Sequence, residues 1–234
     1  MPCGERLLLA GCLLTVALAS PSVFAEDKPG SVVSAFDRIG DLVKMNADMQ
    51  THYGVCPADV ANSARPAWKI FWDSEYWSEE ACEKDLDACY RECSYEHNES
   101  ACFALARNFE DQKRFVPAGF SGMLYAHSCA LGYSGGCTNR AAGLLGDLLK
   151  SDPMSAMEKG ELLSCTFRTF SFSCADRDPW GCTMQGFSYD VGEGVKPDAN
   201  QARQSYLKSC EIAADFEACF AAKARMQQLD TEQK

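Results

Sequence analysis

The sequence predicts an all-α fold, organised as an α/α solenoid of two-helix repeats that disulfides cross-link. Two regularities of the cysteines carry this prediction. Cys93, Cys129 and Cys165 follow one another at intervals of 36 residues, and Cys174 and Cys210 are separated by the same interval. A period near 36 residues is the length of a helix–turn–helix repeat. Close pairs also recur, each enclosing seven or eight residues: Cys93 and Cys102, Cys129 and Cys137, Cys174 and Cys182, and Cys210 and Cys219.

The best-preserved unit, residues 182–210, shows why each repeat is expected to hold two helices. Apolar side chains recur at helical spacing over residues 184–191, which predicts the first helix. Gly192 and Gly194 can adopt the left-handed conformation that ends a helix. Asp198 then offers a side-chain oxygen to cap the second helix, and a glutamine follows three residues later, as in a capping box. The segment therefore predicts two helices joined by a tight turn.

The composition is that of a folded protein that does not bind nucleic acid. The chain has 234 residues, of which 47% are hydrophobic, so there is enough apolar material for a core. Its formal net charge is -11 at pH 7. Nucleic acids and anionic membrane surfaces both require a basic face. We therefore expect no nucleic-acid partner, and no segment after the first apolar run approaches the length of a membrane span.

Residues 1–25 have the organisation of a secretory signal peptide. Arg6 precedes an apolar run over residues 7–19, which is too short to span a membrane, and we expect cleavage after Ala25. A lipid anchor is the alternative, because the four residues that end at Cys12 resemble a bacterial lipobox. Either route exports the chain, so we expect a periplasmic or extracellular protein.

The number of cysteines favours a disulfide framework over a metal site. Of 14 cysteines, Cys3 and Cys12 fall in the signal peptide, which leaves an even number for the mature chain. A reducing cytosol would not support so many disulfides. No C-x-x-C motif is present, so the sequence lacks both the common zinc-knuckle spacing and covalent haem attachment. We therefore predict neither a metal nor a cofactor.

The motifs of the best-preserved unit are Gly181-Cys182, Gly192-x-Gly194-Val195-x-x-Asp198 and Ala202-x-x-x-Tyr206-x-Lys208-Ser209-Cys210. They resemble the Sel-one-like repeat family, a tetratricopeptide-type family, and in particular its cysteine-rich secreted branch, the Helicobacter cysteine-rich proteins. The resemblance implies a right-handed solenoid. It also implies disulfides that join the end of one repeat to the start of the next, namely Cys93–Cys102, Cys129–Cys137, Cys174–Cys182 and Cys210–Cys219.

The resemblance divides the rest of the chain into three regions. Residues 26–92 would hold an N-terminal capping helix, expected at about residues 32–50, and a divergent first repeat. Residues 93–220 would form the Sel-one-like repeat array. Residues 221–234 would hold the end of a C-terminal capping helix and a tail, with that helix expected over residues 218–229.

The chain departs from the family pattern at several places. Residues 111–117 and 151–153 would have to serve as turns without the family's glycines, and residues 166–174 behave like an insertion. Four cysteines also lack an expected partner, namely Cys56, Cys82, Cys89 and Cys165.

The richest aromatic stretch offers the candidate partner-binding residues. It contains Trp68, Trp72, Tyr76 and Trp77. These side chains either pack inside the first repeat or form an exposed anchor, since Trp and Tyr dominate interface hot spots. Together with the concave surface that a solenoid presents, they favour a scaffold that binds a protein or peptide.

An enzymatic function is the alternative, in the form of a weak β-lactam-binding protein or β-lactamase-type hydrolase. Ser205 and Lys208 form an S-x-x-K motif, and some cysteine-rich relatives bind penicillins. However, the S-D-N and K-T-G motifs that complete such a site are missing. The only histidines are His52, His97 and His127, and we expect them at exposed or helix-flank positions. We therefore assign no catalytic residue.

Overall fold

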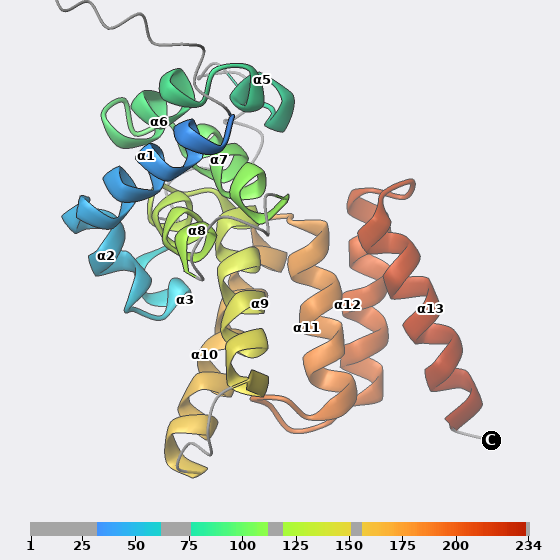
Figure 1. Ribbon diagram of the computed structural model, residues 1–234. Coiled ribbons are helices and arrows are strands. Elements are labelled where there is room, and N and C mark those ends of the chain that lie inside the picture. The colour runs from blue at the N-terminus through green and yellow to red at the C-terminus, as the bar shows by residue number, and fades with distance from the viewer. Residues whose placement is uncertain (1–31, 62–75, 112–118, 151–155, 233–234) are drawn as a thin grey trace, which may run out of the picture. The chain divides into compact units, whose positions relative to one another are not determined.

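The computed structural model describes residues 32–61, 76–111, 119–150 and 156–232, and every regular element in these ranges is a helix, which confirms the all-α prediction (Figure 1). These residues belong to one unit, Ser31–Lys234. The expected signal peptide and its cleavage site lie outside the described residues. The helices are α1 (Val32–Met45), α2 (Ala47–Tyr53), α3 (Pro57–Val60), α5 (Glu79–Lys84), α6 (Leu86–Ser94), α7 (Glu99–Asp111), α8 (Phe120–Ala130), α9 (Ser134–Lys150), α10 (Ala156–Ala175), α11 (Pro179–Val191), α12 (Ala199–Ile212) and α13 (Glu217–Glu232).

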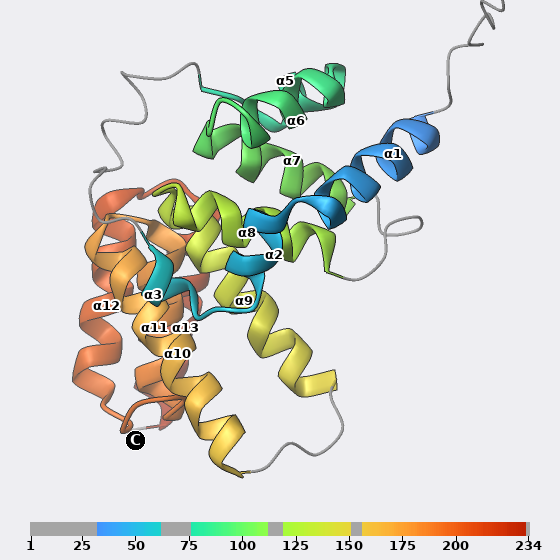
Figure 2. The same ribbon diagram turned by 90° about the vertical axis from the view of Figure 1, so that its left-hand side faces the viewer.

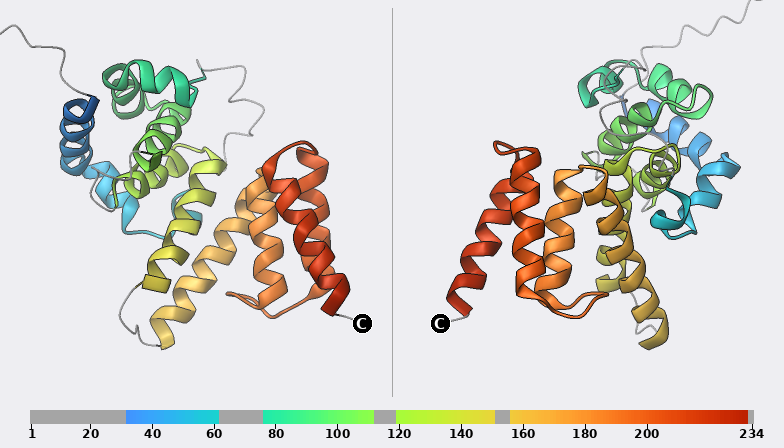
Figure 3. Two further views of the ribbon diagram at one scale, coloured as in Figure 1. Left: turned by 45° about the vertical axis from the view of Figure 1, so that its right-hand side comes forward. Right: turned by 180° about the vertical axis from the view of Figure 1, so that it is seen from behind.

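From α6 onward, each helix packs against the next one along the chain. In addition, α11 contacts both α9 and α13, so neighbouring helix pairs also touch (Figure 3). The three N-terminal helices lie against this series rather than within it. All three contact α8, and α3 also contacts α9 and α10 (Figure 2).

The junction between α8 and α9 has the same geometry as the junction between α10 and α11. In the first, the amide of Tyr133 donates to the carbonyl of Ser128 at 3.0 Å, and in the second, the amide of Asp178 donates to the carbonyl of Ser173 at 2.9 Å. The hydroxyl of each serine also donates to the carbonyl of the first residue of an earlier helix, α7 and α9 respectively. The two junctions are therefore structurally equivalent.

A glycine at each junction lets two helices approach closely. A Cβ atom added at Gly136 would lie 2.9 Å from the amide nitrogen of Cys129, and one added at Gly181 would lie 2.9 Å from that of Cys174. Real Cβ atoms do not approach so closely, so a side chain there would push the helices apart. The cysteine after each glycine then closes the junction with a disulfide.

The turn between α11 and α12 follows the sequence prediction. Gly192 and Gly194 have left-handed φ angles of 79° and 74°. The side chain of Asp198 accepts hydrogen bonds from the amides of Asn200 and Gln201, at 2.9 and 3.0 Å, and so caps α12. The predicted helix end and helix cap are both confirmed.

The expected N-terminal helix over residues 32–50 is broken in two at Asn46. This residue adopts an extended conformation, with φ -76° and ψ 110°, and its side chain accepts a hydrogen bond from the amide of Met49 at 3.1 Å. This capping bond gives the Met49 amide a side-chain acceptor in place of the backbone carbonyl four residues earlier that it would use in a continuous helix. At the other end, α13 contains the whole of the expected C-terminal helix, residues 218–229.

The expected insertion over residues 166–174 adds helix rather than loop, because it lies entirely within α10. Nearly all of residues 111–117 and all of residues 151–153, expected as turns, lie outside the described residues.

The described side chains form two hydrophobic clusters. The N-terminal cluster contains residues of helices α1, α2, α5, α6, α7 and α8, among them Ile39, Leu105 and Leu124. The C-terminal cluster joins α12 and α13, with Tyr206 and Ala222 at its centre. The repeat series therefore has a separate apolar core near its end.

Candidate binding cleft

Six disulfides join the cysteines of the described residues. Five of them connect residues seven to nine positions apart: Cys82–Cys89, Cys93–Cys102, Cys129–Cys137, Cys174–Cys182 and Cys210–Cys219. The sixth, Cys56–Cys165, spans 109 positions. The structure thus contains the four pairs that the family resemblance implies, and two further pairs take up the cysteines that the sequence left unassigned.

The long-range disulfide fixes α3 onto α10. Close to it, the hydroxyl oxygen of Thr169 accepts a hydrogen bond from a backbone amide of α3 at 3.2 Å. The guanidinium of Arg168 donates to both carboxylate oxygens of Asp59, at 2.5 and 3.3 Å, and its Nη2 atom lies 3.6 Å from Sγ of Cys56. Three kinds of contact therefore hold this short helix in place.

A second arginine fixes the end of α2. The guanidinium of Arg140, on α9, lies 4.0 Å from the centroid of the Tyr53 ring, and its Nη2 atom donates to the Tyr53 carbonyl at 3.0 Å. Such a cation–π contact is strongest where water is excluded, and Arg140 is only 5% exposed. Gly122 on α8 makes room for this pair, because a Cβ atom there would lie 2.9 Å from the Tyr53 ring.

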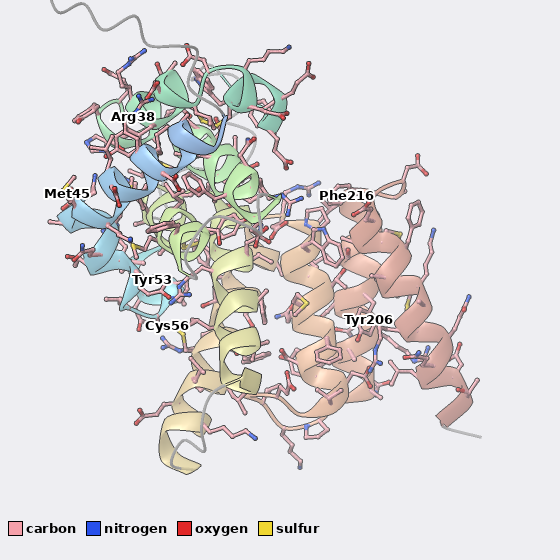
Figure 4. The ribbon with its side chains drawn as sticks, viewed as in Figure 1. Arg38, Met45, Tyr53, Cys56, Tyr206 and Phe216 are labelled. Atoms are coloured by element: carbon pink, nitrogen blue, oxygen red, sulfur yellow. A yellow bond between two sulfur atoms is a disulfide. The ribbon has the colours of Figure 1, made fainter. Side chains whose placement is uncertain are left out.

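These contacts border an open cleft of about 960 Å³ between the α2–α3 segment and helices α9 and α10, with Tyr53 and Cys56 on one wall (Figure 4). We call it the arginine cleft. Its volume lies within the range of small-molecule and peptide-side-chain sites. Its lining consists of Tyr53, Gly54, Val55, Cys56, Arg140, Leu144, Gly160, Glu161, Leu162, Ser164, Cys165 and Arg168.

The electrostatics of the arginine cleft differ from those of the chain as a whole. The lining carries two arginines and only one carboxylate, that of Glu161, although the net charge of the chain is -11. The hydrogen bond from Arg168 lowers the pKa of Asp59, and the same bond raises the pKa of Arg168. Both groups are therefore charged at neutral pH, and Asp59 accepts from two of the five N–H groups of Arg168. The cleft thus offers an anionic ligand the N–H groups outside this ion pair.

The chemistry of the lining suits binding better than turnover. Both of its cysteines are joined in a disulfide, and among the described residues that form the walls none is a histidine. A hydroxyl nucleophile such as Ser164 would need a base to activate it, and the one carboxylate of the lining, that of Glu161, is exposed to solvent. The cleft supplies hydrogen-bond donors and the apolar side chains of Val55, Leu144 and Leu162 instead.

Of the candidate partner-binding aromatics, the structure describes Tyr76 and Trp77, and neither lines the arginine cleft. Trp68 and Trp72 lie outside the described residues. Tyr76 is 47% exposed, whereas Trp77 is half-buried and packs against the N-terminal cluster. Of the two interpretations of this stretch, the packing role therefore fits Trp77.

The S-x-x-K motif is part of ordinary helix packing. Ser205 is buried on α12, where its hydroxyl donates to the carbonyl of Gln201 at 3.0 Å and lies 3.2 Å from the side-chain oxygen of Gln185. Lys208 is exposed on the same helix. The hydroxyl is thus engaged by its own helix and by α11.

One expectation about the histidines is wrong. His97 is exposed and His52 is half-buried, but His127 is only 3% exposed, so it is not a surface residue. Moreover, Nδ1 of His127 lies 3.1 Å from Nδ1 of His52, 75 positions earlier in the chain. Sequence spacing gives no sign of this pairing, because it depends on how α2 packs against α8.

No protein-family model matches the chain, and neither a curated protein nor a solved structure matches it. Two properties bear on where the protein works. Six disulfides are typical of proteins that fold in an oxidising compartment. Within the described ranges, none of the helices is long and apolar enough to cross a membrane.

Proposed function

We propose that the protein is a non-enzymatic scaffold, a right-handed α/α solenoid of Sel-one-like repeats, which binds a segment of another polypeptide outside the cytoplasm. The equivalent α8–α9 and α10–α11 junctions support the repeat assignment, because the same backbone hydrogen bond, the same close glycine and the same disulfide recur in both. Repeats that stack in this way build extended binding surfaces.

The observation that carries the binding function is the arginine cleft. Its guanidinium groups, from Arg140 and Arg168, are held in place by Tyr53 and Asp59, so little side-chain entropy remains to be lost when a ligand binds. Arginine forms paired hydrogen bonds with carboxylates. The segment that enters the cleft should therefore carry a carboxylate, either an acidic side chain or a chain terminus. The acidic surface elsewhere favours a partner that is basic outside this segment.

The test is selection from a peptide library on the purified protein with its disulfides intact, followed by fluorescence anisotropy with the selected peptides. We expect the enriched peptides to share a carboxylate and Arg168→Gln to weaken their binding about tenfold, the usual scale of a lost charged hydrogen bond. Arg38→Gln is the matched control, because Arg38 also donates two hydrogen bonds to an aspartate of another helix but lies on α1. Equal affinities in both variants, or no enriched peptide, would contradict the proposal.

The location outside the cytoplasm has a separate test. N-terminal sequencing of the protein isolated from its own cells should find Glu26 as the first residue. An acylated Cys12 would instead support the lipid anchor, and an intact Met1 would contradict export by either route.

A further inference from the structure

The three histidines of the chain come from three separate elements and gather at one place. His52 lies in the last turn of α2, His97 precedes α7, and His127 lies on α8. The ring centroids of His52 and His127 are 5.3 Å apart, and those of His97 and His127 are 6.3 Å apart. The chain has no other histidine, so all of its imidazole side chains take part in this group.

The spacing of the two inner nitrogens suits a single metal ion. Transition-metal ions bind imidazole nitrogen at about 2.0–2.1 Å, so two such nitrogens on one tetrahedral ion lie about 3.3 Å apart. The Nδ1 atoms of His52 and His127 are 3.1 Å apart. In the absence of an ion, one of them must donate and the other accept a hydrogen bond.

The buried member of the group is in the form that binds metals. Burial, and to a smaller extent His52 and His97, lower the pKa of His127 to about 4, although Asp48 and the backbone of Cys93 act in the opposite direction. His127 is therefore neutral at neutral pH, and only the neutral ring can coordinate a metal. Its Nε2 atom is buried without a partner of good hydrogen-bond geometry among the described residues, although the Cys93 carbonyl lies nearby.

The histidine group is closed off by protein on the side of His127 and open to solvent on the side of His97. A nitrogen of His127 lies within 4.8 Å of the sulfurs of Cys93 and Cys102. These sulfurs form a disulfide, so they lie beside the histidines but are not thiolate ligands. On the outer side, His97 is exposed and its backbone has a φ of 53°, which is uncommon for a residue other than glycine. Its ring centroid lies 6.3 Å from that of His127, so the third imidazole has to rotate inward to reach an ion held by the other two.

We propose that His52, His97 and His127 form a site for one divalent transition-metal ion of the class that prefers imidazole ligands, such as Cu²⁺ or Zn²⁺. His52 and His127 supply the fixed pair of nitrogens, and His97 closes the site from the solvent side. The carboxylate of Asp48, one turn before His52 on α2, adds favourable negative charge beside the ion. Three imidazoles leave at least one position for water or a ligand, as in open metal sites.

The test uses the full chain with all disulfides formed, as verified by the absence of titratable thiols. Isothermal titration with Zn²⁺ should give one site per chain, and the electron paramagnetic resonance spectrum of the Cu²⁺ form should show nitrogen hyperfine splitting. His52→Gln and His97→Gln should each weaken binding at least tenfold and simplify the nitrogen pattern. These two positions are half-buried and exposed, so the result does not depend on whether His127→Gln folds.

Glu96→Gln serves as the control, because Glu96 is an exposed carboxylate next to His97. The substitution removes a charge without removing a proposed ligand. It should leave the affinity within about twofold and the nitrogen splitting intact. An affinity unchanged in His52→Gln, or a Cu²⁺ spectrum with oxygen ligands alone, would overturn the proposal. Neither outcome bears on the arginine cleft, which contains none of these residues.

Discussion

Cys165 and Cys174 stand on the same helix, α10, yet their disulfides leave it on opposite sides. Nine residues separate them, which at 100° per residue is two and a half turns. Cys174 therefore faces α11, where it joins Cys182, while Cys165 faces α3, where it joins Cys56. The stretch that breaks the repeat spacing, residues 166–174, thus ends at the cysteine of the junction disulfide, while Cys165, just before it, attaches the N-terminal segment beside the arginine cleft.

Replacing the long-range disulfide with serines, in Cys56→Ser/Cys165→Ser, should loosen the α2–α3 segment. Removing a native disulfide typically costs about 2–5 kcal/mol of folding free energy, and more for long loops than for short ones. We expect a loss of that size in chemical denaturation, and faster hydrogen exchange in residues 57–60 than in the unmodified protein. Exchange in α11 to α13 should not change, because α3 packs against α8, α9 and α10.

The comparison for this prediction is Cys210→Ser/Cys219→Ser, which removes a short-range disulfide at the far end of the series. Its effect on hydrogen exchange should be confined to α12, α13 and their neighbours. If both double variants accelerate exchange in residues 57–60 equally, the long-range disulfide has no special role in holding α3.

The close glycines at the junctions predict a contrast between two Gly→Ala substitutions. In Gly181→Ala, the new Cβ atom would lie 2.5 Å from Cβ of Ser173, so α10 and α11 must separate, and we expect a loss of about 1–3 kcal/mol. In Gly143→Ala, nothing lies within 4 Å of the new atom, and the better helix propensity of alanine should stabilise α9 by about 0.5–1 kcal/mol.

Thermal or urea denaturation of both variants measures these two changes. The prediction concerns their opposite signs more than their sizes, because propensity acts alike at both sites while the steric effect acts only at the junction. Two stabilising changes would show that the helices can separate without loss and that the close approach is not required.

The parts of the fold that sequence could predict depend on short-range contacts. The cap by Asp198 and the left-handed Gly192 involve residues within one turn, so their chemistry is visible in the sequence. The spacing of cysteines such as Cys129 and Cys137 likewise reflects a local junction. The break at Asn46 was missed because the apolar pattern on either side fits one continuous helix.

The parts that sequence could not predict join elements far apart in the chain. Arg140 and Tyr53 are 87 positions apart, and their contact depends on α2 lying across α8 and α9. The same packing brings His52 to His127. A single sequence carries no signal for such pairs, because local spacing does not show which distant helices pack together.

Asp178 predicts a pH dependence of stability. Burial raises the pKa of this carboxyl above its ordinary value of 3.8, and nearby Asp176 adds to the rise, although Thr138 and two amides of α11 donate hydrogen bonds to it. The protonated form is thus favoured by folding. Its contribution to stability is complete below pH 3.8 and is lost as the pH rises through the raised value.

Asp178→Asn should therefore keep the cap of α11 while removing the titration. We expect its free energy of unfolding, relative to that of the unmodified protein, to increase between pH 4 and pH 7 in urea denaturation. Asp178→Ala removes the titration and loses the cap as well, so it should be about 1 kcal/mol less stable than Asp178→Asn at both pH values. An Asn variant whose relative stability falls as the pH rises would mean that the carboxylate is stabilised by folding.

The ion pair between Asp190 and Arg225 holds α13 against α11. The side chain of Asp190 is only 6% exposed, and it accepts hydrogen bonds from Arg225 and, at 3.3 Å, from the hydroxyl of Tyr206, which packs in the C-terminal cluster (Figure 4). Removing the arginine leaves a buried carboxylate without its countercharge. Full burial of both partners would make this cost 3 kcal/mol or more, but Arg225 is partly exposed, so we expect about 2 kcal/mol for Arg225→Met.

A double-mutant cycle separates this charge effect from the loss of packing. Asp190→Asn/Arg225→Met removes both charges, and it should be more stable than Arg225→Met alone, with a coupling of at least about 1 kcal/mol. Arg203→Met is the control, because its partner Asp230 is exposed, and such surface pairs contribute little. Strictly additive effects at positions 190 and 225 would show that α13 is held by the apolar contacts of Tyr206 and Ala222 rather than by the buried ion pair.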